Sequence, residues 1–243
     1  YGVPGMSLAV AKDGRLLLAR GYGWADRDAQ EPVQPDTRFR IASVSKPVTA
    51  FAILSLVDDG KIALDAPILT QFDQRAAARA KEPNDPRWNQ ITPRHLLQHT
   101  GGFDRGASFD PMFRSRSIAE AEGVAPPANG DAIVRYMLDR ALDFEPGSRY
   151  AYSNFGYLLL GQLIESVSGQ DYETFVRDDV LAPMNIRDMA LGRTLLEHRA
   201  PKESRYYASG PRASVFESTT PRVPRPYGAW YFVPMPAPAA SFA

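Results

Sequence analysis

A serine and a lysine three positions apart are the residues of this sequence best suited to chemistry. Ser43 and Lys46 lie at the front of an apolar run with the composition of a helix. Residues three apart on a helix share one face, so the hydroxyl and the amine can meet. Serine is a weak nucleophile until a neighbour takes its proton, and a desolvated lysine can do that. The spacing therefore indicates covalent acyl transfer through Ser43.

A tyrosine and an asparagine form a second motif much later in the chain. Tyr152 and Asn154 follow a Glu-Pro-Gly-Ser turn and precede another apolar run. A phenol beside a cation can act as a general base, and Lys46 can supply the cation. The Asn154 amide can donate and accept, so it can hold Lys46 on one side and a substrate carbonyl on the other. Taken alone, each motif is more often structural: a helix start with an exposed lysine, and a turn.

Two helices are predicted to position these motifs. The apolar pattern predicts a helix over residues 47–59, with proline in its first turn and Gly60 as a left-handed stop. Ser43 would lie at the positive N-terminal end of this helix, which its apolar content predicts to be buried. The second helix is predicted over residues 155–167, ended by Gly169.

The other elements are a hairpin, shorter helices and irregular chain. Residues 6–12 and 15–21 are predicted to be strands joined by Asp13-Gly14, a strong hairpin signal. Large and small apolar side chains alternate in the first strand, as in a buried one. Residues 103–130 are rich in Pro, Ser and Gly and predict a long surface excursion with one helical turn at 118–122. Further helices are predicted at residues 70–81, 92–99 (capped by Thr92), 132–141 (capped by Asp131) and 172–181 (capped by Asp171).

Composition narrows the function further. The 243 residues are 44% hydrophobic and 23% charged, as in an ordinary globular protein. The 28 basic and 28 acidic residues balance, which argues against nucleic-acid binding. No run approaches the length of a membrane span. Without cysteine, disulfides and thiolate catalysis are excluded, and the compartment stays open between periplasm and cytosol.

Histidines do not indicate a metal site. His95 and His99 have helical spacing, but the residues between them include no glutamate for a metalloprotease motif. His99 is predicted to be a structural hydrogen-bonding residue at a helix end. No cofactor is expected. The chain opens in strand-like sequence without a signal peptide, so one was removed or never existed.

Together the two motifs and their flanks resemble the penicillin-recognising serine hydrolases. A tyrosine opening the second motif is most similar to the class C β-lactamases, the DD-peptidases of that type and the family VIII carboxylesterases. The resemblance runs from about residue 5 to residue 192, and it favours a periplasmic or secreted protein. Three stretches carry it: FRIA at 39–42, LLQHTGG at 96–102 and FEPGSRYAYSNFGYLLLG at 144–161.

The resemblance implies an α+β fold of the β-lactamase/transpeptidase type, with a mostly helical lobe packed on an antiparallel sheet. It also implies an acyl-enzyme route on β-lactams or small carboxylic esters. Ser43 would attack the carbonyl, and Tyr152 and Lys46 would share the movement of its proton. Asn154 would bind substrate, and the Ser43 N–H would supply half of an oxyanion hole, whose donors contribute a few kcal/mol each. The alternatives are a non-catalytic module that binds penicillin or peptidoglycan, and an acyl trap that deacylates too slowly to turn over.

The third motif of these hydrolases has no clear copy in this sequence. It is a Lys/His-Thr/Ser-Gly triplet or a variant, on a strand beyond the helical lobe, and it gives the second oxyanion donor. Residues 208–210 (ASG) lack the cation, and residues 227–230 (YGAW) have only the preceding Arg225. The later strands also have no counterpart, so the chain reads as truncated at its C-terminus. Its parts would be a hairpin at 1–42, the helical lobe at 43–202, and an irregular segment with a Pro/Ala-rich tail at 203–243.

Two further expectations follow from the C-terminal segment. A truncated sheet would leave an apolar face and an edge of the hairpin exposed, and an isolated hairpin is marginal. We therefore expect a homo-oligomer in which another copy covers this surface, or a C-terminal segment that folds back over it. Aromatic residues of this segment are expected to line an acyl pocket, to pack in the core or to form an oligomer contact: Tyr206, Tyr207, Tyr227, Trp230, Tyr231 and Phe232.

Overall fold

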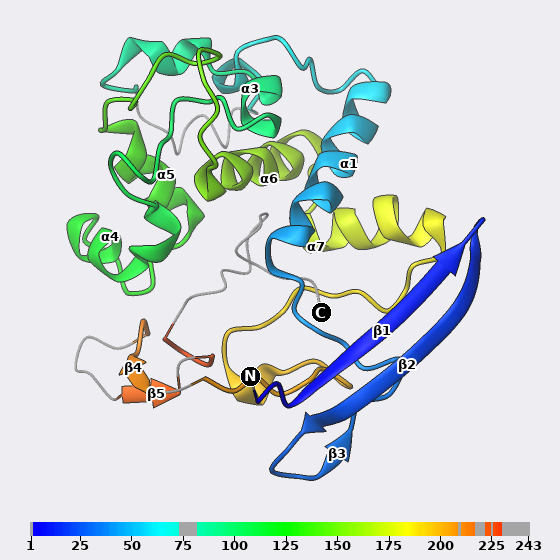
Figure 1. The fold of residues 1–243 in the computed structure, drawn as a ribbon. Coiled ribbons are helices and arrows are strands. Elements are labelled where there is room, and N and C mark those ends of the chain that lie inside the picture. Colours follow the sequence, from blue (N-terminus) through cyan, green and yellow to red (C-terminus); the bar gives the residue numbers. More distant parts are fainter. Residues whose placement is uncertain (1, 73–81, 209, 217–221, 225, 230–243) are drawn as a thin grey trace.

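The computed structural model describes residues 2–72, 82–208, 210–216, 222–224 and 226–229 (Figure 1). A long hairpin lies at one side of a body built mainly from helices (Figure 1). The strands are β1 (Gly5–Lys12), β2 (Arg15–Asp26), β3 (Glu31–Pro32), β4 (Pro211–Ala213) and β5 (Arg222–Pro224). The helices are α1 (Ser45–Asp58), α3 (Pro93–Leu97), α4 (Ser115–Ala121), α5 (Gly130–Leu138), α6 (Asn154–Ser168) and α7 (Tyr172–Phe175), which continues as a π-helical segment over Val176–Leu181. The 3₁₀ turns are Ala42–Val44, Ile68–Thr70, Pro86–Gln90, Pro111–Phe113, Ala182–Met184 and Leu196–His198.

The predicted N-terminal hairpin is confirmed. β1 and β2 pair antiparallel, with Lys12 opposite Arg15 at the turn. Asp13 and Gly14 have φ angles of 50° and 72°, the left-handed backbone that a two-residue hairpin turn requires. The second strand runs further than predicted, to Asp26, where it pairs with β3.

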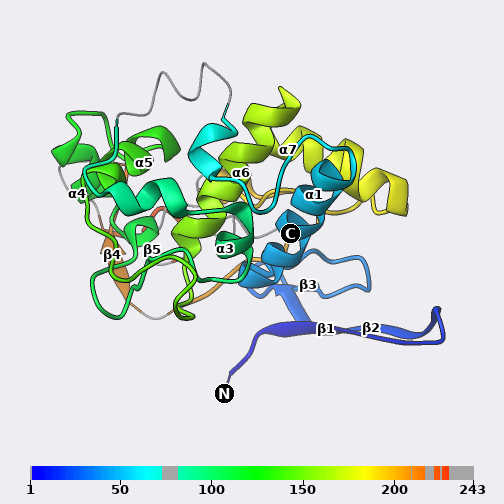
Figure 2. The same ribbon diagram turned by 90° about the horizontal axis from the view of Figure 1, so that it is seen from above.

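The prediction that the first strand is buried is wrong. Met6 and Val10 stand opposite Tyr22 and Leu18, and residues opposite each other share a face of the hairpin. All four side chains are 40% or more exposed. Seen from above, the hairpin extends away from the helices (Figure 2). Alternation within one strand does not reveal what covers it, and in the described part of the chain this face is open.

Helix α6 is the centre of the core. It packs against α1, α3 and α7 and buries Phe155 and Leu159 completely or nearly so. Ser153 caps its start by accepting a hydrogen bond from the Gly156 N–H at 3.1 Å. Gly169, with φ of 71°, ends it in the left-handed conformation. The helix predicted over residues 155–167 is therefore confirmed, one residue longer at each end.

Helix α1 is buried on one face only. Lys46, Thr49 and Ile53 point into the protein, whereas Phe51 is 60% exposed on the opposite face. Gly60, with φ of 70°, follows its end as predicted. The predicted helix is confirmed, although it begins two residues earlier and ends one residue earlier than the predicted 47–59. The expectation that it is buried holds for one face only, because apolar content does not reveal which sides of a helix meet a neighbour.

The predicted surface excursion over residues 103–130 is also wrong. Phe103, Met112 and Ile118 are each less than 10% exposed and belong to the core. The helical turn predicted at 118–122 belongs to α4, which packs against α5. Prolines and glycines interrupt the apolar pattern of this segment, so its buried residues do not stand out in the sequence.

Two of three smaller helices differ from the predictions at their ends. Asn129, not Asp131, caps α5 by accepting from the Ala132 N–H at 3.0 Å, and that helix stops at Leu138. Thr92 caps α3 as predicted, although α3 ends at Leu97. Asp171 caps α7, and the π-helical segment after it completes the predicted span. Of the helix predicted at 70–81, residues 73–81 lie outside the described residues.

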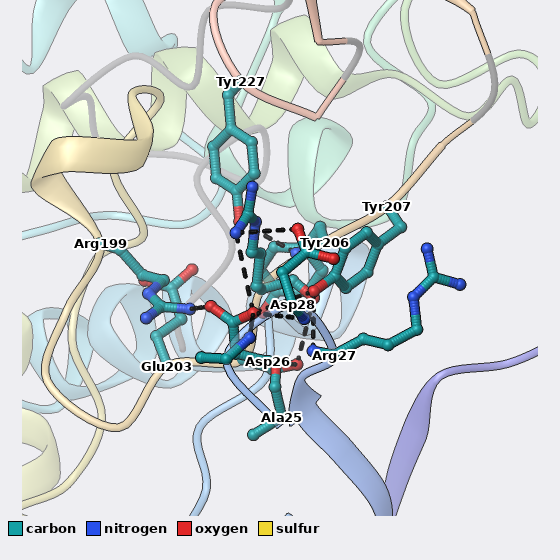
Figure 3. Close-up of polar contacts among 12 residues, drawn as sticks. Ala25, Asp26, Arg27, Asp28, Arg199, Glu203, Tyr206, Tyr207 and Tyr227 are labelled. Carbon is teal, nitrogen blue, oxygen red and sulfur yellow. Dashed lines mark hydrogen bonds and ion pairs between the residues drawn. The ribbon is translucent and has the colours of Figure 1, made fainter. Parts of the chain in front are cut away.

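The chain after residue 203 returns to the end of β2 (Figure 3). The Arg205 N–H donates to the carbonyl of Ala25 at 2.8 Å, and the Tyr207 hydroxyl donates to the buried Asp26 carboxylate at 3.1 Å. The expected return of the C-terminal segment is therefore seen at this end of the strand, whereas no part of the chain that the structure describes covers the apolar face of the hairpin. Within the described residues, no helix combines the length and apolar character needed to cross a bilayer.

The same segment holds the residues that precede Ser43. Arg40 pairs through Nε with the carboxylate of Glu203 at 2.9 Å, and the Glu203 side chain is fully buried. The guanidinium of Arg40 lies over the rings of Tyr206 and Tyr227, 4.7 and 5.3 Å from their centroids. These two tyrosines thus pack around Arg40. Trp230, Tyr231 and Phe232 lie outside the described residues.

Candidate active site

Ser43 lies in the 3₁₀ turn Ala42–Val44, immediately before α1. Ala42 has a φ of 47°, an unusual conformation for a residue with a side chain. Ser43 is exposed, whereas Lys46 is only 5% exposed in the first turn of α1. The Lys46 Nζ donates to Ser43 Oγ at 3.3 Å. The hydroxyl and the amine therefore meet as the spacing predicts, although the serine precedes the helix rather than opening it.

Tyr152 and Asn154 reach the same point from the start of α6. The extended backbone at the capping residue Ser153 (φ −130°, ψ 124°) separates the two side chains and sends both toward α1. The Tyr152 hydroxyl lies 2.6 Å from Ser43 Oγ and accepts from Lys46 Nζ at 2.5 Å. Asn154 Oδ1 accepts from the same Nζ at 2.8 Å. The structure brings together all four residues selected from the sequence.

Lys46 has the environment of a proton acceptor. Burial lowers the pKa of Lys46 to about 8; the charge of Asp110 opposes this shift and that of Arg105 adds to it. A lysine with an ordinary pKa is fully protonated at neutral pH, whereas this one loses its proton near pH 8. A substantial neutral fraction is thus present under mildly alkaline conditions, at hydrogen-bond distance from a serine hydroxyl and a phenol.

Sequence reasoning missed Asp110. Its Oδ2 accepts from Asn154 Nδ2 at 2.7 Å, and its Oδ1 accepts from the Met112 N–H at 3.0 Å. Burial raises the pKa of the Asp110 carboxyl above its usual value, against the hydrogen bonds and nearby cations that lower it. The only local signal is an Asp-Pro pair, which marks many turns.

Arg105 was also missed. Its guanidinium lies 4.9 Å from the centroid of the Tyr152 ring, at cation–π distance. It comes from the same segment, 103–130, that the sequence placed on the surface. This cation therefore stands beside the phenol that contacts Ser43.

His99 is the structural hydrogen-bonding residue that the sequence predicts. Its ring packs against Tyr152 and Tyr157, with centroids 4.6 and 5.1 Å away, and its Nδ1 accepts from the Ser153 N–H at 3.2 Å. Burial first, and the charge of Lys46 second, lower the pKa of His99 to about 4, so its ring is neutral at neutral pH. Among the described residues, no group of His, Asp or Glu side chains is placed to hold a metal ion.

Comparison with known proteins identifies the family. The sequence model of the β-lactamase family matches residues 1–240. The chain belongs to the β-lactamase family. It is 35% identical over 185 residues to the esterase EstB of Burkholderia gladioli, a match that covers 74% of this chain and 45% of EstB.

Solved structures of the same fold agree with this assignment. The octameric penicillin-binding protein homologue from Pyrococcus abyssi matches with a TM-score of 0.65 and 26% identity, over 99% of this chain and 49% of that one. The D-amino acid amidase from Ochrobactrum anthropi SV3 matches with a TM-score of 0.66 and 28% identity, over 99% of this chain and 61% of that one. The predicted family and fold class are confirmed, and the chain spans about half the length of the relatives it matches.

The two candidates for a third motif lie partly outside the described residues, because Ser209, Arg225 and Trp230 do. Tyr227, which opens the second candidate, is buried, and its hydroxyl accepts from the Tyr206 N–H at 2.9 Å. The ring of this tyrosine packs against the Arg40 guanidinium. Among the described residues, the four side chains that meet at hydrogen-bond distance around Ser43 and Lys46 belong to the first two motifs.

Proposed function

We propose that this protein is a serine acyl-hydrolase that forms an acyl-enzyme through Ser43 with small carboxylic esters or β-lactams, in the manner of the class C β-lactamases. The observation that supports it most directly is the contact among three groups: Ser43 Oγ, the Tyr152 hydroxyl and Lys46 Nζ, at 2.6, 2.5 and 3.3 Å. A nucleophile, a base and a third group that orients the base are what activation of a serine requires.

The acylation step balances with Lys46 neutral. As Ser43 Oγ bonds to the substrate carbonyl carbon, its proton passes to the Tyr152 oxygen, and the phenolic proton passes to Lys46 Nζ. The carbonyl oxygen takes the negative charge beside the Ser43 N–H, which supplies one oxyanion donor. When the tetrahedral intermediate collapses, the same route returns a proton to the leaving alcohol or amine. Water then attacks the acyl carbonyl carbon, and its proton passes to Tyr152 and Lys46. The bond between that carbon and Ser43 Oγ breaks, the proton returns to Ser43 Oγ, and the acid is released.

Small esters are the substrates favoured here over β-lactams. The described residues contain no clear copy of the third-motif cation that would bind the carboxylate of a β-lactam, and generic acyl transfer needs that cation less. The relative EstB is named an esterase. Hydrolysis of p-nitrophenyl butyrate and of a chromogenic cephalosporin separates the two substrate classes, and we expect the ester to be the faster substrate.

Intact-protein mass spectrometry after exposure to penicillin tests the acyl-enzyme itself. We expect a covalent adduct of penicillin's mass that maps to Ser43 and decays with time, together with ester turnover. A persistent adduct without turnover would instead identify an acyl trap. If the protein forms no adduct and also hydrolyses no ester, the hydrolase is refuted and a binding module is favoured.

We also propose that another copy of this chain covers the open face of the β1–β2 hairpin. Met6, Val10, Leu18 and Tyr22 form an exposed apolar surface on it, and the homologue from Pyrococcus abyssi is octameric. Sedimentation velocity should show an assembly larger than one chain, and Leu18→Glu should dissociate it by placing a charge on the buried interface. A strictly monomeric wild-type protein would contradict the proposal.

A further inference from the structure

A line of hydrogen bonds runs from Lys46 to Asp110. Lys46 Nζ donates to Asn154 Oδ1 at 2.8 Å, and Asn154 Nδ2 donates to Asp110 Oδ2 at 2.7 Å. The lysine comes from α1, the asparagine from α6, and the aspartate from the loop before the turn Pro111–Phe113. Three separate segments of the chain thus meet behind Ser43.

This line has only one direction that satisfies every atom. A protonated lysine only donates and a carboxylate only accepts, whereas an amide does both from opposite ends. The carboxylate of Asp110 must therefore face the NH₂ group of Asn154, which leaves Oδ1 for Lys46. The other oxygen of Asp110 is held by the Met112 N–H at 3.0 Å, so the carboxylate cannot turn freely. Asn154 is only 7% exposed, and a rotated amide there would leave buried polar groups unsatisfied.

We propose that Asp110 is a positioning residue for the reaction: through the amide of Asn154 it fixes where Lys46 Nζ lies, and its carboxylate supplies a negative charge near that amine. The proposal rests on the acyl-hydrolase function proposed above. Among the described residues, Asp110 hydrogen-bonds to Asn154 and to the Met112 N–H and not to Ser43 or Tyr152, so its effect is transmitted through Asn154 and through space.

The charge effect has a definite sign. Several titratable or charged groups face Lys46. Asp110 and Arg105 come from the segment between α3 and α4, and His99 lies just after α3. Tyr152 and Tyr157 lie near the start of α6. Among these groups Asp110 supplies the negative charge that raises the pKa of Lys46, and His99 stays neutral because its pKa is about 4. Removing the charge of Asp110 therefore lowers the pKa of Lys46 below about 8. The neutral amine needed for acylation then persists to lower pH.

Two substitutions separate the charge from the hydrogen bond. Asp110→Asn keeps an oxygen that can accept from Asn154 but loses the charge, so the acidic limb of the kcat/KM profile for p-nitrophenyl butyrate should move to lower pH. Asp110→Leu loses both, and its kcat should also fall about 10- to 100-fold, the range expected when a reacting group is displaced by about 1 Å. Asp110→Glu should restore much of the wild-type limb.

Asp143 provides the matched control. A small cavity is lined by Asp143 together with Asp110 and Asn154. The Asp143 carboxylate accepts from the Asp104 N–H at 2.7 Å and from Ser108 Oγ at 3.0 Å. Asp143→Asn should leave the acidic limb unchanged. A wild-type limb in Asp110→Asn, together with a kcat within twofold of wild type in Asp110→Leu, would overturn the proposal.

An NMR titration of Lys46, which does not depend on catalysis, tests the role of Asp110 separately from the proposed acyl-hydrolase function. The ¹³Cε resonance of Lys46 in lysine-labelled protein reports its protonation directly. It should titrate near pH 8 in the wild type and at lower pH in Asp110→Asn. If the wild type hydrolyses nothing but this shift occurs, the proposed function fails and the electrostatic role of Asp110 stands; an unshifted titration refutes that role whatever the activity.

Discussion

Replacing Ser43 by alanine should abolish ester and β-lactam turnover and remove the penicillin adduct. Loss of the nucleophile leaves no oxygen to form the acyl-enzyme. In serine hydrolases that work through an acyl-enzyme, kcat then falls about 10⁴-fold or more. Ser43 is exposed, and among the described residues its hydroxyl hydrogen-bonds to Tyr152 and Lys46, so the protein should remain folded without it. Steady-state rates and intact mass measure the effect, and a thermal melt checks the fold.

Ser45 is the matched control for this substitution. It lies two residues away in the same motif, but it is only 1% exposed and so cannot meet a substrate. Ser45→Ala should keep the adduct at Ser43. Unchanged turnover in Ser43→Ala, or an adduct that moves to another serine, would refute the assignment of the nucleophile.

The parts of the fold that could be predicted from sequence depend on a few local residues. Asp13-Gly14 fixes the hairpin turn, Gly60 ends α1, and Gly169 ends α6, because each requires a left-handed backbone at that position. Such constraints act within a few residues and can be seen in a single sequence.

The features that could not be predicted depend on what lies nearby in space. The open face of β1 has the alternation of a buried strand, since local pattern does not encode the presence of a covering element. Phe103, Met112 and Ile118 reach the core from a segment whose prolines and glycines hide any period. Local sequence therefore predicts where a helix ends more reliably than it predicts whether an irregular segment is buried.

The candidate site divides in the same way. Ser43, Lys46, Tyr152 and Asn154 lie in two short motifs whose residue types have few other uses together, so their meeting could be expected. The proposed role of Asp110 depends on the fold, which places its Oδ2 atom 2.7 Å from Asn154 Nδ2. The residues next to Asp110 in the sequence do not predict that contact.

Replacing Tyr152 by phenylalanine tests how the proton leaves Ser43. The Tyr152 oxygen lies 2.6 Å from Ser43 Oγ, closer than Lys46 Nζ at 3.3 Å, so the direct transfer should go to the phenol. Phenylalanine keeps the ring that packs on His99 and removes that oxygen. We expect kcat for p-nitrophenyl butyrate to fall about 10²- to 10⁴-fold, the usual contribution of a general base, with KM little changed.

The size of that loss separates two mechanisms that the same three atoms permit. If Lys46 alone removed the proton of Ser43, the Tyr152→Phe variant would still hold Lys46 Nζ close to Ser43 Oγ, and kcat would fall by less than tenfold. If the proton passes through the phenol to Lys46, then Tyr152→Phe and Lys46→Met each break the route, and the double variant should be little slower than either single one. Additive losses in the double variant would show two independent contributions and would contradict a shared path.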